Sequence, residues 1–379
     1  MTTVDRTAVL RYRFARHQLD REPGRVTNVA DVALLDLGVQ DSGPDGAAWA
    51  LACRGYDGGF GGRGRDVAIA WTLRGAPHAY RRADLAAVAT ATAPLSEADA
   101  AKRMYDAAKP LKAAGIGVLD ALDVVAGHMR EIVARPTSKG DLSSALTGAL
   151  DDPYLRTCVP CHATHTFEMP FRLAALQAGL ELEPGTSPPV LRRIPKMRAP
   201  RYRHLGGDAD PRFDVIRRQL AFYGPISVKE VAAFVDATVK DVEAHWPDDA
   251  VEVTVRGAAK GSRFVLAEDV DALTGAGRAA PVVRLLGPFD GYLQLRDREL
   301  LVADGAHRKD LWRTLGRPGA IVDGGEVVGT WRPRQSGSKL TVAVDPWVAL
   351  TPTVRRRVDD EAERLATHRG VAFAGVAVG

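Results

Sequence analysis

The sequence predicts an α+β fold, and three observations support this prediction. Amphipathic helices with cap signatures precede a strand hairpin between residues 213 and 273. A similar order of elements recurs twice nearer the N-terminus. After Pro281, short β-type runs replace the helical pattern. With 379 residues, 46% hydrophobic and 26% charged, the chain is long enough for two or three globular domains or for several smaller modules.

The first module is predicted over residues 1–92. Helices are expected around 29–38 and 46–54, followed by a strand in VAIAWTLRG at 67–75. The turn between the helices contains Gln40, Asp41 and Ser42. Asp or Ser at such a turn can cap the next helix, whereas an amide can orient water at a catalytic site. From the residues alone, both interpretations stay open.

The second module is predicted over residues 93–205. Helices are expected at 97–108, 116–134 and 167–178, with a helix cap at Ser138 to Asp141. The last helix leads into LELEPGTSPPVLRRI, which has the spacing of a strand pair.

The third module, predicted over residues 206–275, has the clearest pattern. One helix ends at Gly224-Pro225, a capping box at Ser227 to Glu230 starts the second, and Thr238 caps the third. Alternating apolar residues from Val251 to Leu266 then predict a hairpin. Three helices and a terminal hairpin make a winged helix, so we predict tandem winged-helix modules. Such modules bind DNA or, alternatively, other proteins.

The remaining residues, 276–379, predict a small sheet or a small β-barrel-like domain, with a C-terminal helix. The runs VVRLLGPFDGYLQL, RELLVAD, AIVDGGEVVGTWRP and KLTVAVDPW are separated by Gly, Asp and Pro turns. A helix from Thr353 is expected to close the chain, with Val358 and Leu365 packed inward.

Two basic segments are candidate DNA contacts. The linker between Glu183 and Asp208 contains no acidic residue, so its six cations have no counter-charge nearby in the sequence. They are Arg192, Arg193, Lys196, Arg198, Arg201 and Arg203. A predicted hairpin carries Arg332, Arg334 and Lys339, which could probe a DNA groove or only protect a sheet edge. The net charge of +4 is compatible with nucleic acid but does not establish binding.

Three cysteines argue against a disulfide framework and for a reducing compartment. No signal peptide or long apolar run is evident, so we predict a cytoplasmic protein that does not bind a membrane. Cys158, Cys161, His162 and His165, with Glu168 after them, have spacings that zinc sites use, but a second ligand pair is missing. Two buried small thiols at a helix entrance are the favoured alternative, so we predict neither metal nor cofactor.

Several segments resemble the winged-helix DNA glycosylases that include the azinomycin-resistance and interstrand-crosslink-unhooking enzymes. The resemblance is carried by GVQDSGPDGAAWALACRG, WTLRGAPHAYRRADL, FRLAALQAGLELEPGTSPPVLRR, LLGPFDGYL and GTWRPR. The family has a Gln-apolar-Gln or Gln-apolar-Asp catalytic motif. Gln40 falls on its first residue, Asp41 on the apolar position and Ser42 on the second polar position, so the last two depart from the pattern.

The resemblance implies a DNA glycosylase that acts on double-stranded DNA carrying bulky or crosslinking N7-alkylated purines, in DNA repair or resistance to a genotoxin. It implies catalytic roles for Gln40, Asp41 and Ser42, and places His78 where it could contact phosphate or the lesion. A structural role for His78 is the alternative. No obligate protein partner is evident. The alternative functions are a noncatalytic DNA-binding protein, either a transcription regulator or a lesion binder, and a protein-binding module.

Overall fold

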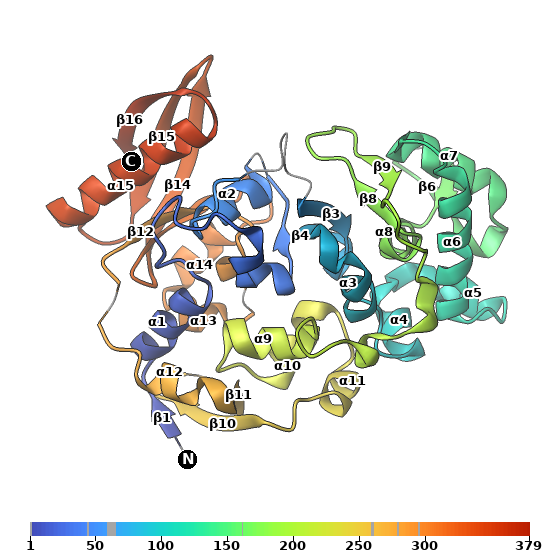
Figure 1. Cartoon of the computed structure of the whole chain (residues 1–379), viewed down its shortest axis with the longest axis horizontal. Coiled ribbons are helices and arrows are strands. Elements are labelled where there is room, and N and C mark those ends of the chain that lie inside the picture. Colours follow the sequence, from blue (N-terminus) through green and yellow to red (C-terminus); the bar gives the residue numbers. More distant parts are fainter. Residues whose placement is uncertain are drawn as a thin grey trace.

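The computed structural model describes residues 2–43, 45–58, 66–160, 162–258, 261–278, 280–294 and 296–379. Helices and strands both occur throughout the described residues, so the expected α+β class is confirmed. Figure 1 shows the helices from Glu97–Arg103 to Glu168–Gln177 at the right, the strands Val67–Trp71 and Pro77–Arg81 in the middle and the C-terminal sheet at the upper left. No helix of the described residues is long and apolar enough to cross a membrane.

The N-terminal elements include the strand and the helix that flank the candidate turn. They are β1 (Thr2–Val4), α1 (Arg6–Arg16), β2 (Val39–Gln40), α2 (Gly46–Ala52), β3 (Val67–Trp71), β4 (Pro77–Arg81) and α3 (Leu85–Ala91). The prediction of a helix around 29–38 is wrong, because this segment forms two short 3₁₀ turns at Val29–Asp31 and Ala33–Asp36. Val32 separates them with an extended backbone, which suits a β-branched residue.

The next elements form the lobe at the right of Figure 1. They are α4 (Glu97–Arg103), α5 (Ala108–Ala113), α6 (Val118–Ile132), β5 (Thr137–Ser138), α7 (Lys139–Ala149), β6 (Leu155–Cys158), β7 (Ala163–Thr166), α8 (Glu168–Gln177), β8 (Leu180–Leu182) and β9 (Val190–Arg193). The helix expected at 97–108 is interrupted, since Tyr105 has a φ of 51° between α4 and α5. The cap at Ser138 is confirmed by its side-chain bond to the Asp141 amide.

One sheet joins strands of the first two predicted modules, in the order β2-β4-β3-β8-β9-β5. Ile69 of β3 is the partner of Leu182 in β8. Glu181 in β8 reinforces the junction through ion pairs to Arg82 (2.7 Å) and Arg192 (3.0 Å). The first two stretches therefore share a sheet that no local pattern could have predicted.

The elements expected for the third stretch are present. They are α9 (Val215–Tyr223), α10 (Val228–Val235), α11 (Val239–Ala244), β10 (Ala250–Val255) and β11 (Arg263–Leu266). Both predicted caps form, at Ser227 with Glu230 and at Thr238 with Asp241. The turn between the strands lies partly outside the described residues, which omit 259 and 260. β1 pairs in parallel with β10, a contact that the sequence did not predict.

The C-terminal region differs from the expected barrel. The third stretch ends with α12 (Val270–Thr274), and the C-terminal region then contains β12 (Val283–Leu286), α13 (Arg298–Leu301), α14 (Gly305–Leu311), β13 (Gly319–Asp323), β14 (Glu326–Ser336), β15 (Lys339–Pro346), α15 (Pro352–His368) and β16 (Ala372–Val378). The sheet is open, in the order β12-β13-β14-β15-β16, and α15 contacts β12, β15 and β16. The helix α15 buries Val358 and Leu365 against one face of the sheet. This face is therefore covered although the sheet does not close into a barrel.

Two further expectations for this region are wrong. RELLVAD contains the short helix α13 instead of a strand, and its adjacent Leu300 and Leu301 are both buried. The helix α15 does not close the chain, because β16 follows it and pairs in parallel with β15. A four-residue helix and a strand of mixed small and apolar residues both lack a distinctive sequence pattern.

The apolar core links distant parts of the chain. The largest cluster of buried residues combines Leu34, Trp49, Phe222, Leu285 and Leu365 with their neighbours, and so joins the N-terminal elements, α9–α11 and the C-terminal sheet. A second cluster fills the lobe of α4–α8 and includes Trp71 of β3. The candidate turn therefore lies at the edge of the larger core.

Candidate active site

The candidate turn starts at the short strand β2. Gln40 is the ladder partner of His78 in β4, and the Asp41 amide donates to the Pro77 carbonyl at 2.8 Å. The Gln40 Nε2 donates to the Ser42 Oγ at 3.0 Å. Gln40, Asp41 and Ser42 are all half-buried. The hydrogen bond to Ser42 gives the side-chain amide of Gln40 a defined orientation.

Asp41 points toward the helix that follows. Its Oδ1 accepts a hydrogen bond from the Ala47 amide at 2.8 Å, in the first turn of α2. A Cβ on Gly46 would lie 2.0 Å from the same oxygen, so this close approach requires glycine. The pKa of Asp41 is raised overall, because burial raises it by more than the hydrogen bond from the Ala47 amide lowers it. The carboxylate thus caps a helix end that Asp45 does not cap with its own side chain.

The segment 287–290, GPFD, packs against this turn. Gln40 and Ser42 line a cavity of about 10 Å³ together with Pro288 and Phe289. Asp290 is fixed by the buried Arg54, whose two terminal nitrogens lie 2.8 and 2.9 Å from its carboxylate oxygens. The cavity has room for about one water molecule and none for a purine base.

Arg74 is a site residue that the sequence analysis missed. Its guanidinium donates to the Gln40 Oε1 at 3.5 Å and to the Gln294 Oε1 at 3.4 Å, and it lies 4.5 Å above the Phe234 ring. Its φ of 57° places it in the left-handed region, where non-glycine residues are uncommon. The Arg-Gly turn after a buried strand was the only local signal.

His78 does not have the exposure that a DNA contact needs. It is 3% exposed, and its Nδ1 lies 3.0 Å from the Ala76 carbonyl and 3.2 Å from the Thr72 Oγ1. Burial, followed by repulsion from Arg74, lowers the pKa of His78 to about 3. A buried neutral ring offers no charge to phosphate, so the structure favours the structural interpretation of this histidine.

The basic linker has more counter-charge than its sequence indicates. Arg192 pairs with Glu181 at 3.0 Å and Arg201 pairs with Asp123 at 3.3 Å, so the expectation of six uncompensated cations is wrong. The acidic partners come from β8 and α6, outside the sequence window. Arg193, Lys196, Arg198 and Arg203 are exposed. The linker runs along the lobe at the right of Figure 1, whereas α2 lies near the middle.

The predicted cationic hairpin is formed by β14 and β15, which turn at Gly337. Arg334 and Lys339 are exposed, while Arg332 lies 3.9 Å from Asp310. Figure 1 shows this hairpin projecting beyond α15.

The residues considered for zinc are only partly described. Cys161 lies outside the described residues, and the Nδ1 of His165 lies 2.8 Å from the Thr166 carbonyl. Among the described residues, no group of three or more His, Cys, Asp or Glu side chains could hold a metal ion.

Comparison with solved structures supports the fold. The Streptomyces sahachiroi DNA glycosylase AlkZ matches over 100% of both chains, with a TM-score of 0.73 and 21% sequence identity. A comparison with curated proteins found no match. Residues 37–368 match the family described as DNA glycosylase AlkZ-like. The chain belongs to this family.

Membership of the AlkZ-like family makes the chain a DNA glycosylase, an enzyme that hydrolyses N-glycosidic bonds, as the sequence analysis predicted. Its substrate is therefore DNA. The match begins at residue 37 and so includes the turn at Gln40. Family membership favours the enzyme over the noncatalytic and protein-binding alternatives.

Proposed function

We propose that the chain excises bulky or crosslinking N7-alkylated purines from double-stranded DNA, with Gln40 beside the deoxyribose of the target nucleotide. The observation that carries the proposal is the fixed Gln40 amide, held by Ser42 at 3.0 Å and facing Arg74 at 3.5 Å, where the cavity that it lines among the described residues is only about 10 Å³. Repair of alkylated DNA or resistance to a genotoxin would use the same reaction.

The chemistry suits a neutral catalytic side chain. An N7-alkylated purine carries a positive charge, so the electron pair of the C1′–N9 bond leaves readily on the base and neutralises it. Water then bonds to C1′ and loses a proton. Gln40 cannot accept that proton near neutral pH, but its carbonyl dipole can orient the water and stabilise an oxocarbenium-like sugar.

The small cavity supports an approach to the sugar from a DNA groove. Glycosylases that extrude the base need a pocket that encloses it. Among the described residues, Gln40 instead lines a space of about 10 Å³ together with Pro288 and Phe289. A bulky adduct could therefore remain outside the protein while the sugar meets Gln40.

The DNA-binding framework is part of this proposal. The stretches 1–92, 93–205 and 206–275 would act as winged-helix modules, and 276–379 as the C-terminal domain. Support comes from the order α9, α10, α11, β10 and β11 in the third stretch. The exposed residues Arg193, Lys196, Arg198, Arg203, Arg334 and Lys339 would contact DNA phosphates.

Release of free base from duplex DNA containing N7-alkylguanine tests the proposal. The intact protein should release the base, and Gln40→Ala should reduce the rate by about 10²-fold or more, as loss of a preorganised dipole does elsewhere. Liquid chromatography of the released base measures both rates.

Thermal unfolding and DNA binding of Gln40→Ala serve as controls, and both should match the wild-type protein. Tight binding by the wild-type protein without any release would contradict the proposed substrate. Equal release by wild type and Gln40→Ala would remove Gln40 from the mechanism.

A further inference from the structure

Four arginines, one of which is hydrogen-bonded to Gln40, carry charges that no salt bridge neutralises among the described residues. We call them the guanidinium cluster: Arg74, Arg296, Arg298 and Arg317. Within the described parts of the chain, none of the four forms an ion pair. Three stack on aromatic rings instead, with Arg74 over Phe234 at 4.5 Å, Arg298 over Trp312 at 5.0 Å and Arg317 over Phe289 at 5.2 Å. Stacking fixes a guanidinium without cancelling its charge.

Each of these four arginines is repelled by at least one of the others. Burial, followed by repulsion from Arg296, lowers the pKa of both Arg74 and Arg298. Burial and repulsion from Arg298, Arg74 and Arg296 lower the pKa of Arg317 to about 10. Asp236 partly offsets the charge of Arg74, but its carboxylate also accepts a 2.7 Å hydrogen bond from Tyr105. Like charges gathered in this way favour a bound anion.

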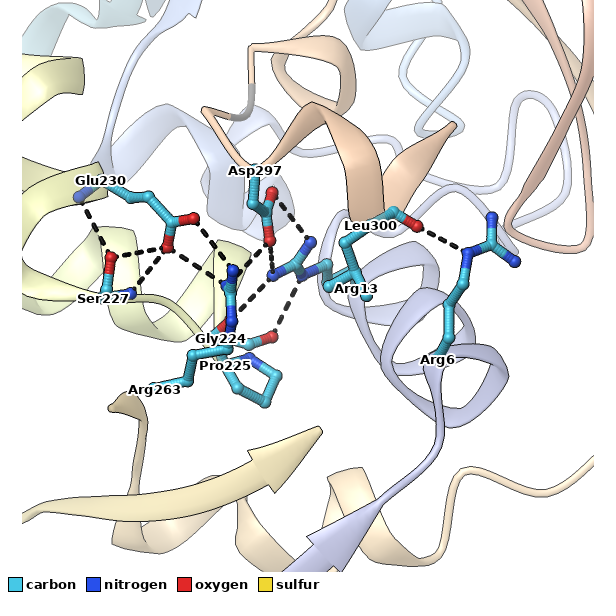
Figure 2. Close-up of polar contacts among 9 residues, drawn as sticks. All are labelled: Arg6, Arg13, Gly224, Pro225, Ser227, Glu230, Arg263, Asp297 and Leu300. Atoms are coloured by element: carbon cyan, nitrogen blue, oxygen red, sulfur yellow. Dashed lines mark hydrogen bonds and ion pairs between the residues drawn. The ribbon is translucent and has the colours of Figure 1, made fainter. Parts of the chain in front are cut away.

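The acidic residue inside the cluster is turned away from it. Asp297 lies between Arg296 and Arg298 in the sequence, yet it is buried and accepts from Arg13 at 2.8 Å and Arg263 at 3.3 Å. Figure 2 shows the Asp297 carboxylate facing these two guanidinium groups, with Glu230 beside Arg263. Two arginines from α1 and β11 thus bind the carboxylate that could have neutralised the cluster.

The cluster also adjoins a larger hollow. Arg296 and Arg298 line a cleft of about 850 Å³ whose wall includes the exposed cations Arg256, next to the β10–β11 turn, and Lys309 of α14. Glu299 lines the cleft too, and it pairs with Arg308 at 3.4 Å. A phosphate backbone leaving the cluster would therefore meet further positive charge.

The reaction itself gives a reason for a bound anion. The sugar at Gln40 becomes positively charged as the base leaves, and Arg74 lies 3.5 Å from the Gln40 Oε1. A guanidinium group without a salt-bridge partner at that distance opposes the developing charge. A phosphate bound between them would remove this repulsion.

We propose that the guanidinium cluster binds phosphodiester groups of the DNA strand that carries the target nucleotide, next to the target sugar. This inference rests on the proposed function, because that function places the sugar at Gln40. It assigns the phosphate contacts closest to the target sugar to the guanidinium cluster. The contacts proposed for the basic linker and the cationic hairpin would be additional.

Salt dependence of DNA binding by the intact protein tests the inference. The probe is a duplex containing a tetrahydrofuran abasic site, and the variant is Arg296→Ala with Arg298→Ala. Each lost phosphate contact should reduce the slope of log K against log salt by about 0.9, so the double variant should lose about 1.8. Fluorescence anisotropy across a salt series measures the slope.

A matched control removes the same charge elsewhere. Arg355→Ala with Arg356→Ala changes two exposed arginines on α15 and should leave the slope unchanged. Arg296→Lys with Arg298→Lys should restore most of the slope, because lysine keeps the charge. Thermal unfolding checks that each variant is folded.

An unchanged slope in the Arg296/Arg298 alanine variant would overturn the inference, even if the wild-type protein releases alkylated bases. Binding of deoxyguanosine monophosphate by the same variant is a second measurement. If the alanine variant lost this binding but kept the duplex slope, the site would serve a free nucleotide, and the inference would also be overturned. A reduced slope without any base release would support the cluster and contradict only the proposed substrate.

Discussion

At the scale of single residues, the candidate turn assigns different tasks to three neighbouring side chains. Gln40 faces the site, Ser42 holds its amide, and Asp41 bonds to the first turn of α2. A helix cap and a catalytic base make different demands on Asp41, because only the base requires a charge.

Asp41→Asn should therefore keep base release within a few-fold of the wild-type rate, since an amide oxygen can still accept from the Ala47 amide. Asp41→Ala should lose about 1 kcal/mol of unfolding free energy, the usual cost of losing a cap. Base-release assays and urea unfolding measure these effects. A loss of release of about 10²-fold or more in Asp41→Asn would instead identify a general base.

His78 predicts a pH dependence of stability. Its folded-state pKa of about 3 is below its usual value of 6.5, so the unfolded chain binds more protons between these pH values. The contribution to stability is fully present above pH 6.5 and is lost as the pH falls toward 3, at a limiting slope of about 1.4 kcal/mol per pH unit.

His78→Asn should reduce the slope of unfolding free energy against pH in this window. Urea unfolding at several pH values measures it. Burial also lowers the pKa of His17, so part of the slope should remain in the variant. Identical slopes in both proteins would mean that His78 is protonated in the folded state.

At the scale of elements, a buried ion pair fixes the GPFD segment beside the turn. Arg54 follows α2, Asp290 ends the segment, and both side chains are almost fully buried. Arg54→Met should destabilise the protein by about 3–5 kcal/mol, because the Asp290 charge would stay buried without its partner. The exposed pair of Arg217 with Asp249 provides the control, and Arg217→Ala should cost about 1 kcal/mol or less.

Urea unfolding at neutral pH compares the two variants. Similar small losses would indicate that Asp290 finds another partner or becomes protonated. Because Pro288 and Phe289 line the cavity at Gln40, Arg54→Met should also slow base release.

The sequence predicted those elements that depend on neighbouring residues. The caps at Ser138, Ser227 and Thr238 formed as expected, since each bonds to an amide three residues away. Elements without such local signals were missed or misassigned, including α13 and β16.

The same distinction applies to the site. Gln40 was found through a resemblance. Arg74 approaches Gln40 from 34 residues away in the sequence, and Gln294 contacts Arg74 from 220 residues away, and pairing at that range leaves no periodic pattern. The acidic partners of Arg192 and Arg201 were missed for the same reason.

At the scale of the whole molecule, the shared core predicts unequal folding of excised segments. Residues 206–275 pack Phe222 and Tyr223 into the cluster that also contains the N-terminal and C-terminal elements. An isolated 206–275 fragment should therefore show no cooperative unfolding. A 93–193 fragment should keep helical structure, because most of its core cluster lies within its own residues. Circular dichroism during thermal unfolding compares both fragments, and a cooperative transition in the first would contradict this prediction.

The parallel pairing of β1 with β10 has a practical consequence. Residues 2–4 are hydrogen-bonded to residues 253–255, in the strand that leads to the β10–β11 turn and to Arg256 at the large cleft. A fluorophore attached at Thr3, an exposed position, would consequently sit on the hairpin itself. Its emission would report movement of that hairpin when a duplex arrives, without any label on the nucleic acid.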